Sequence, residues 1–183
     1  DSFKLVPFSA ALDSGQISPT TTFGVPDQVK IGGKTFHDAE QHAAMSMTAT
    51  DILTQSSNIG TYLISQGLGE TRLLAQVQRL GFGQPTGLNF PGESSGLLMN
   101  AERWQSTDLA ALPIGQVDAT TPLQVLDAYN AVANGGNFVW PSLIRATVAA
   151  DGSTASTKST AQRRVMSPTT AQQLTEMLRQ VVA

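Results

Sequence analysis

Apolar side chains recur at the spacing of one helix face over several segments of this chain. Residues three and four apart lie on the same side of a helix, so this spacing predicts amphipathic helices. The predicted helices are residues 3–14, 49–66, 70–80, 122–134 and 168–182. In the last helix we expect four side chains to face the core: Leu174, Met177, Leu178 and Val181. The pattern therefore predicts a mainly helical lobe.

Residues with known preferences for helix ends delimit these segments. Thr48 and Asp51 form the Thr-x-x-acid pattern of a capping box. Thr121 and Ser167 each precede a proline, which is favoured at the first position of a helix. Glycines, which often end helices, stand where we expect four segments to stop: Gly15, Gly67, Gly81 and Gly135.

Strand signals are fewer, and the clearest lie late in the chain. Residues 137–150 alternate enough for strands and lead to a turn at Asp151-Gly152, so we expect strand chiefly there. Residues 17–38 predict an extended loop with a small hairpin around Gly32-Gly33. Residues 82–116 are rich in Gly, Pro and Ser and predict a long loop, a feature typical of segments that wrap a site.

Composition excludes several classes of protein. The 183 residues carry a net charge of -3, and Arg163-Arg164 is the only basic doublet, so we expect no nucleic-acid partner. There is no cysteine, which excludes disulfides and cysteine-based metal sites. No apolar run approaches the roughly 18 residues of a membrane helix, so we expect any membrane anchor to lie outside this chain. The first residue is not Met, and a predicted helix runs to the end, so we interpret the chain as a piece of a longer protein.

Three features offer candidate chemistry. Lys4 stands at the start of the first helix, Ser56-Ser57-Asn58 interrupts the second, and the sequence "LPIGQVDATTPLQ" leads into a later helix. Each has an ordinary explanation when taken alone. A lysine at a helix start is usually solvated, and Ser-Ser-Asn usually caps a helix or forms a loop. Only their combination favours a catalytic site.

Other polar clusters carry less weight. The sequence "HDAEQH" brings His37 and His42 close to Asp38 and Glu40, but their spacing differs from the i, i+4 of a helical zinc motif. We interpret it as a surface loop and expect no metal and no cofactor. Three further carboxylates are scattered and suggest no pair: Asp108, Asp118 and Asp127. We expect Trp104 and Trp140 to be packing anchors.

The three features together resemble the transpeptidase domain of penicillin-binding proteins, especially the class B, division-type members. That family carries Ser-x-x-Lys at a helix start, then Ser-x-Asn on a loop between helices, then Lys-Thr-Gly on a strand. The likeness extends through "TATDILTQSSNIGTYLISQGLG" and "STDLAALPIGQVDATTPLQVLDAYNAVANGG" to nearly the whole chain. It implies an α+β fold of the serine β-lactamase/transpeptidase type, mostly its helical lobe with an incomplete antiparallel sheet. It also implies that residues 1–183 are part of one domain that continues beyond both termini.

The resemblance implies catalytic roles for three residues. Lys4 would be the base that activates a serine, Ser56 would relay a proton to the leaving amine, and Asn58 would hold the substrate backbone. If so, these side chains converge on one cleft although they are distant in the sequence. Substrate contacts are expected from three further positions: Ser57, Gly115 and Gln116.

Two parts of the family pattern are not met in this chain. The nucleophile position, three residues before Lys4, is Asp1, and Ser2 is a weak alternative because residues i and i+2 do not share a helix face. Lys34-Thr35 is followed by Phe36 and precedes the Ser-x-Asn motif, so it is not the Lys-Thr-Gly motif. We therefore expect the chain alone to be incomplete and inactive.

The function implied by the resemblance is cross-linking of peptidoglycan by acyl transfer from D-Ala-D-Ala peptide stems. Its expected partners are those stems, β-lactam antibiotics and other cell-wall or division proteins, at the extracytoplasmic face of the bacterial cell membrane. The alternative is a non-catalytic scaffold that keeps the fold without the serine nucleophile. A class D β-lactamase or a β-lactam sensor is disfavoured, because those relatives favour Ser-x-Val where this chain has Asn58.

Overall fold

A computed structural model describes residues 2–98, 106–116, 118–157 and 161–182. Its helices are η1 (Ser2–Lys4), α1 (Leu5–Asp13), α2 (Ala49–Thr54), α3 (Asn58–Leu68), α4 (Glu70–Arg79), α5 (Ser106–Ala111), η3 (Leu112–Ile114), α6 (Pro122–Ala133) and α7 (Pro168–Val181). Its strands are β1 (Thr22–Val25), β2 (Gln28–Ile31), β3 (Lys34–His37), β4 (Met45–Thr48), β5 (Leu97–Leu98), β6 (Asp118–Ala119), β7 (Asn137–Val139), β8 (Ala146–Val148), β9 (Thr154–Ser156) and β10 (Gln162–Arg164).

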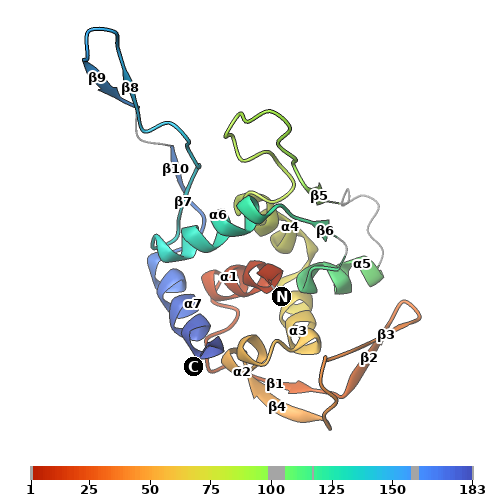
Figure 1. Ribbon diagram of the computed structural model, residues 1–183. Helices are drawn as coiled ribbons and strands as arrows, with labels where there is room; N and C mark the ends of the chain where they lie inside the picture. Colours follow the sequence, from red (N-terminus) through yellow and green to blue (C-terminus); the bar gives the residue numbers. More distant parts are fainter. Residues whose placement is uncertain (1, 99–105, 117, 158–160, 183) are drawn as a thin grey trace.

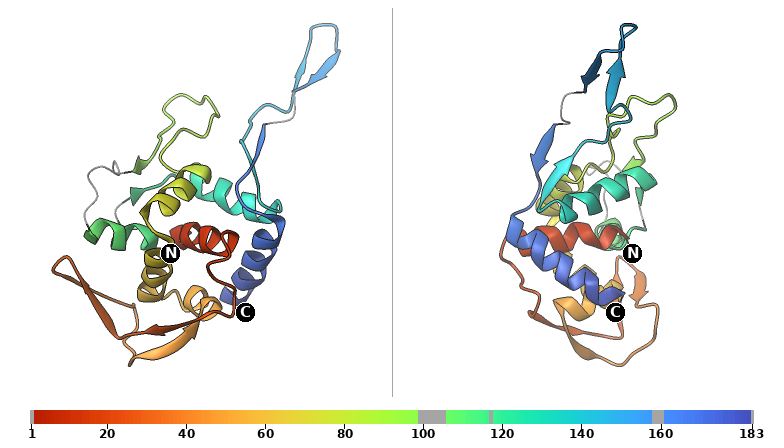
Figure 2. Two further views of the ribbon diagram at one scale, coloured as in Figure 1. Left: turned by 180° about the vertical axis from the view of Figure 1, so that it is seen from behind. Right: turned by 60° about the vertical axis from the view of Figure 1, so that its left-hand side comes forward.

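Helix α1 lies at the centre of the helical lobe, with other helices around it (Figures 1 and 2). Its sequence is apolar on nearly every side, and every residue from Leu5 to Leu12 is buried. A helix of this kind is stable only when neighbours cover all its faces. Helices α3, α4 and α7 pack directly against it. Lys4 immediately precedes α1 and is therefore carried into the interior.

The capping residues predicted from the sequence are confirmed. The Thr48 side chain accepts from the Asp51 N–H and the Asp51 carboxylate accepts from the Thr48 N–H, which makes a complete capping box on α2. Thr121 caps α6 in the same way, and the Ser167 hydroxyl accepts from the first turn of α7. These bonds satisfy N–H groups that have no partner within their own helix.

Three local predictions within the helical lobe are wrong. Helix α3 does not stop at Gly67 but continues to Leu68 and ends at Gly69, whose φ of 82° is the first that leaves the helix. The loop predicted over 82–116 contains α5 and η3, because a short apolar run there packs its residues into the core. Val181 is 47% exposed because it lies at the last position of α7, beyond the residues of this helix that are buried.

The strands form two-stranded antiparallel pairs. β2 and β3 make the hairpin predicted around Gly32-Gly33, where both glycines have positive φ. β1 pairs with β4 in the register Thr22↔Thr48, so much of the strand content precedes residue 49. The expectation that strand lies chiefly in 137–150 is therefore wrong. The β8–β9 hairpin turns near Asp151-Gly152 as predicted and projects from the body of the molecule (Figures 1 and 2).

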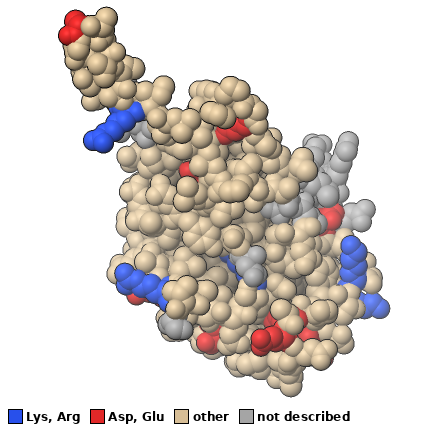
Figure 3. Space-filling model, viewed as in Figure 1, with Lys and Arg blue, Asp and Glu red and all other residues tan. Residues whose placement is uncertain are grey.

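Charged side chains are sparse on the face shown in Figure 3, and both signs occur there. This agrees with a chain in which 14% of residues are charged. Within the part of the chain that the structure describes, no helix is both long and apolar enough to cross a bilayer.

Candidate active site

Lys4 and Ser56, which are 52 residues apart, meet inside the helical lobe. Lys4 Nζ donates to the Ser56 hydroxyl at 2.7 Å and to the Ser56 carbonyl oxygen. Lys4 is only 1% exposed, because the residues that follow it belong to the buried helix α1. The ordinary explanation of a solvated lysine at a helix start therefore does not apply.

The backbone of Ser56 explains why two helices are separated by serines. Ser56 follows the end of α2 and has a φ of 56°, in the left-handed region where glycine is usually found. Its N–H donates to the Leu53 carbonyl, and the Ser57 N–H donates to the Ile52 carbonyl. This pair of bonds is a Schellman motif, which ends α2 by reversing the chain. A serine at this position costs roughly 1–2 kcal/mol of backbone strain, and its hydroxyl contacts Lys4.

Helix α3 starts at once after this reversal, and a distant carboxylate holds its first turn. Ser57 is the N-cap and accepts from the Gly60 N–H. The Asp38 carboxylate accepts from the Ser57 hydroxyl at 2.6 Å and from the N–H groups of Asn58 and Ile59 at 2.6 and 2.9 Å. Three donors of the first turn are thus satisfied by one side chain from the segment after β3. The position of Asp38 therefore fixes where α3 begins, directly after Ser56.

Asn58 occupies the first position of α3, two residues after Ser56. Its backbone N–H donates to the Asp38 carboxylate, and its side-chain amide nitrogen lies 3.5 Å from the His37 carbonyl oxygen. The side chain is half-buried. The chain reversal at Ser56 and the carboxylate of Asp38 thus set the position of Asn58 relative to the Lys4–Ser56 pair.

The electrostatic setting of Lys4 favours loss of its proton. Desolvation by burial lowers the pKa of Lys4 from 10.5 to about 8, although the negative charge of Asp38 acts in the opposite direction. Desolvation disfavours the ammonium because water no longer stabilises its charge. Near physiological pH a minor fraction of Lys4 is therefore neutral and able to accept a proton from a nearby hydroxyl.

The sequence matches the family model described as the penicillin binding protein transpeptidase domain over residues 2–183. The chain belongs to this family. It is 42% identical to penicillin-binding protein PbpB of Mycobacterium tuberculosis over 179 aligned residues, and this aligned region covers 98% of this chain and 26% of that protein. It is 36% identical to the probable peptidoglycan D,D-transpeptidase PbpC of Pseudomonas aeruginosa over 143 aligned residues, and this aligned region covers 78% of this chain and 25% of that protein.

Solved structures of the same family confirm the fold. Penicillin binding protein 3 of Mycobacterium tuberculosis in complex with ampicillin matches with a TM-score of 0.96 and 41% identity, over 100% of this chain and 40% of that chain. The resemblance to class B penicillin-binding proteins and the α+β transpeptidase fold predicted from the sequence are thereby confirmed. The chain spans about a quarter of the length of the curated relatives it matches.

The other positions that the penicillin-binding protein pattern singles out are placed in different ways. Gly115 ends η3 with a φ of 76°, and a Cβ there would lie 3.3 Å from the Cβ of Phe3, so this turn packs beside the segment that carries Lys4. Gln116 follows it and is exposed. Ser57 is 1% exposed, and its hydroxyl already donates to Asp38 and accepts from Gly60, so its expected substrate contact gains no support.

The nucleophile position of the penicillin-binding protein pattern, Asp1, lies outside the described residues. Ser2, the weak alternative, is exposed, and its carbonyl oxygen lies 3.5 Å from the Tyr129 hydroxyl. Among the tryptophans, Trp104 also lies outside the described residues, whereas Trp140 packs edge-on against Phe138.

Asp38 is the residue of this site that sequence reasoning missed. The segment is predicted to be a surface loop, which is wrong for Asp38, because this residue is 7% exposed and its carboxylate is bonded to the start of α3. Burial raises the pKa of Asp38, but hydrogen bonds from Ser57, Ile59, His42 and Asn58 prevail and hold it below 3.8. Asp38 is 19 residues from Ser57, so no local pattern reveals the contact.

Proposed function

We propose that this segment is part of a serine-type D,D-transpeptidase domain that continues beyond both termini and cross-links peptidoglycan. The observation that supports this most strongly is the buried Lys4 amine at 2.7 Å from the Ser56 hydroxyl. A desolvated lysine with a lowered pKa can act as the base that a serine nucleophile needs, and a hydroxyl bonded to that lysine can relay a proton. The names of relatives such as PbpC, a probable peptidoglycan D,D-transpeptidase, agree with this chemistry.

In the proposed reaction a serine hydroxyl attacks the carbonyl of a D-alanyl-D-alanine stem, and neutral Lys4 takes its proton. The tetrahedral intermediate then expels D-alanine, and Ser56 passes a proton from Lys4 to the leaving amine. The amide of Asn58 donates to the stem backbone and keeps the reacting carbonyl in place. An amine from a second stem resolves the acyl-enzyme. A β-lactam enters the same acylation step.

Position 1 favours a second candidate function. The family spacing puts the nucleophile there, and this chain has Asp1, whose carboxylate does not form a serine ester. The second candidate is a non-catalytic member of the family that keeps the fold as a scaffold or binding domain. Both candidates place the protein at the extracytoplasmic face of a bacterial cell membrane, anchored by a segment outside these residues. Both include other cell-wall or division proteins among its partners.

A labelling experiment with a fluorescent penicillin distinguishes these functions. The 183-residue chain, the intact protein and the intact protein with Asp1→Ser are each incubated with the penicillin, and mass spectrometry locates any covalent adduct. We expect an adduct at position 1 of the Asp1→Ser protein and none on the 183-residue chain. Adding Lys4→Met to that protein should abolish labelling, whereas Lys34→Met, on the exposed β2–β3 hairpin, should retain it.

Three other results would change these assignments in different ways. An adduct at Ser2 or Ser56 of the chain with Asp1 would show that position 1 is not the nucleophile. An adduct on the intact protein only after Asp1→Ser would favour the scaffold, which keeps the fold and lacks the nucleophile. The absence of an adduct from every form, including Asp1→Ser, would contradict the transpeptidase proposal.

A further inference from the structure

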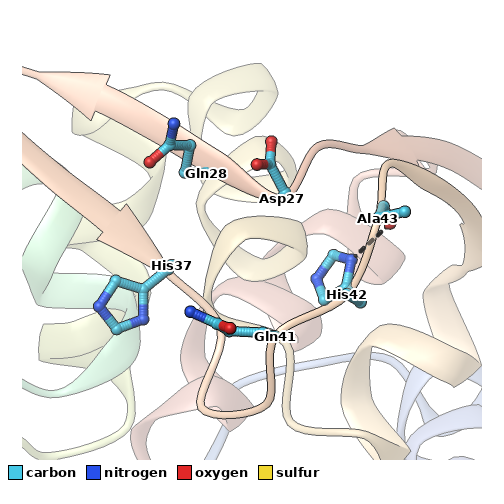
Figure 4. A pocket seen from close by; sticks show the side chains of 6 residues that line it. All are labelled: Asp27, Gln28, His37, Gln41, His42 and Ala43. Atoms are coloured by element: carbon cyan, nitrogen blue, oxygen red, sulfur yellow. Dashed lines mark hydrogen bonds between the residues drawn. The ribbon is translucent and has the colours of Figure 1, made fainter.

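The side chain of His42 contacts a hydrogen-bond acceptor with each ring nitrogen. Its Nδ1 is 2.8 Å from the Ala43 carbonyl oxygen, and its Nε2 is 3.1 Å from Asp38 Oδ2 (the first bond is drawn in Figure 4). A neutral imidazole has one N–H and one lone pair, so it can donate to only one of these oxygens. Both contacts are favourable only when His42 is protonated and donates from both nitrogens.

The carboxylate that His42 contacts also holds the start of α3. Asp38 Oδ2 accepts from both His42 and the Ser57 hydroxyl, while Oδ1 accepts from the N–H groups of Asn58 and Ile59. These groups follow Ser56 directly, and Ser56 is held in a left-handed conformation between the two helices. A change in the hydrogen bond from His42 to Asp38 therefore affects the position of Ser56, which contacts Lys4.

We propose that His42 and Asp38 form a proton-dependent clamp that positions the Ser56–Asn58 turn against Lys4, so that acylation is coupled to the protonation of His42. Neither side chain contacts the reacting atoms, so both are positioning residues. The proposal rests on the proposed transpeptidase function, because it assigns the turn a role in acylation.

The charges around His42 favour its protonated form. The hydrogen bond to the Ala43 carbonyl, the hydrogen bond to Asp38 and the negative charges of Asp38 and Asp27 raise the pKa of His42 above 6.5. The hollow beside it is also lined by His37 at the end of β3 and by three residues without ionisable side chains, and Figure 4 shows their arrangement. The charge of Lys4 also interacts with the Asp38 carboxylate.

The direction of the pH effect follows from this raised pKa. The clamp is fully formed below pH 6.5, the ordinary value for histidine, and is lost as the pH rises through the raised value. Above the pKa of His42, the neutral ring keeps one N–H, so its other nitrogen presents a lone pair to either the Ala43 carbonyl or the Asp38 carboxylate and one hydrogen bond is lost. Because the deprotonation of Lys4 has its own effect on the rate, the effect of His42 must be measured as a ratio between variants that share Lys4.

The test measures acylation by a fluorescent penicillin from pH 5.5 to 8.5 in the intact protein carrying serine at position 1. His42→Gln keeps an amide that can donate to Asp38 but does not titrate. The ratio of the unsubstituted rate to the His42→Gln rate should fall about threefold over this range, as expected for a partly exposed charged pair. The matched control is His37→Gln, which leaves the ring of His42 in place, and its ratio should stay flat. A flat ratio for His42→Gln would overturn the clamp.

Nuclear magnetic resonance of ring-labelled histidine tests the protonation directly, without requiring activity. The His42 signal is assigned by its loss in His42→Gln. We expect both ring nitrogens to be protonated at pH 6.5 and Asp38→Asn to lower the pKa of His42. A His42 that is mainly neutral at pH 6.5 would overturn the clamp even if the variants acylate poorly. If no form makes a penicillin adduct, the transpeptidase function fails and the acylation coupling fails with it. If the adduct forms normally and the His42→Gln ratio is flat, the clamp is refuted but the transpeptidase function is not.

Discussion

Replacing Lys4 by Met tests the free-energy cost of burying this amine. The unfolded chain keeps a lysine protonated up to about pH 10.5, whereas folded Lys4 loses its proton near 8. Between these values the unfolded state binds more protons, so the stability of the folded chain increases with pH. At about 1.4 kcal/mol per pH unit, the interval from 10.5 to about 8 corresponds to an upper limit of roughly 3 kcal/mol. Ser56, to which Lys4 donates, is half-buried, and the solvent that reaches it lowers this free energy below the upper limit.

Lys4→Met lacks this titration but fills nearly the same space. The difference in free energy of unfolding, unsubstituted chain minus Lys4→Met, should therefore increase by about 2–3 kcal/mol between pH 7 and pH 10.5. Urea unfolding followed by circular dichroism at intermediate pH values measures it. Lys34→Met on the exposed β3 strand is the matched control and should give a constant difference. A constant difference for Lys4→Met as well would show that Lys4 is not desolvated in the folded state.

Two further substitutions test the packing and the charges around the turn and the helix ends. Gly60→Ala should destabilise the chain by about 1–2 kcal/mol, since overpacking outweighs the better helix propensity of alanine. A Cβ at Gly60 would lie 2.6 Å from the buried Ile52 side chain, whereas a Cβ at Gly67 would meet only the flexible end of a side chain. Gly67→Ala should therefore lower the free energy of unfolding in urea by less than Gly60→Ala does. Equal decreases for the two variants would contradict this packing. Asp13→Asn should cost about 0.5–1 kcal/mol at pH 7. Burial raises the pKa of Asp13, but bonds from the start of α7, led by the Ser167 N–H, hold it below 3.8. The difference should thus vanish as the pH falls through that lowered value, and a difference that persists in acid unfolding would refute the argument.

The sequence predicts those parts of the fold that depend on neighbouring residues. Thr48, Thr121 and Ser167 cap helices in the structure as they do in the sequence pattern, because a cap and the N–H groups it binds are three residues apart. The end of α4 before Gly81 follows for the same reason. The lysine and the Ser-x-Asn turn were recognised through a resemblance rather than through geometry, and the structure adds that they meet at 2.7 Å.

The features that were missed depend on contacts between distant parts of the chain. The β1 strand is stabilised by β4, whose paired residues lie 20 to 26 positions later, so no local pattern in either segment reveals the pairing. Asp38 is polar and stands among other polar residues, and only the folded chain brings it beneath α3. The Gly67 prediction failed because glycine permits a helix end but does not require one. Tertiary packing decides such cases.

The projecting β8–β9 hairpin provides a site for modifying the protein away from its catalytic turn. Residues 146–156 are all exposed, and the described contacts of the hairpin with the helical lobe are few. Loop tips of this kind tolerate inserted sequence because no buried backbone group loses its partner. A fluorescent or affinity tag inserted between Asp151 and Gly152 would therefore report on the position of the molecule in a cell while the Lys4–Ser56 contact remains intact.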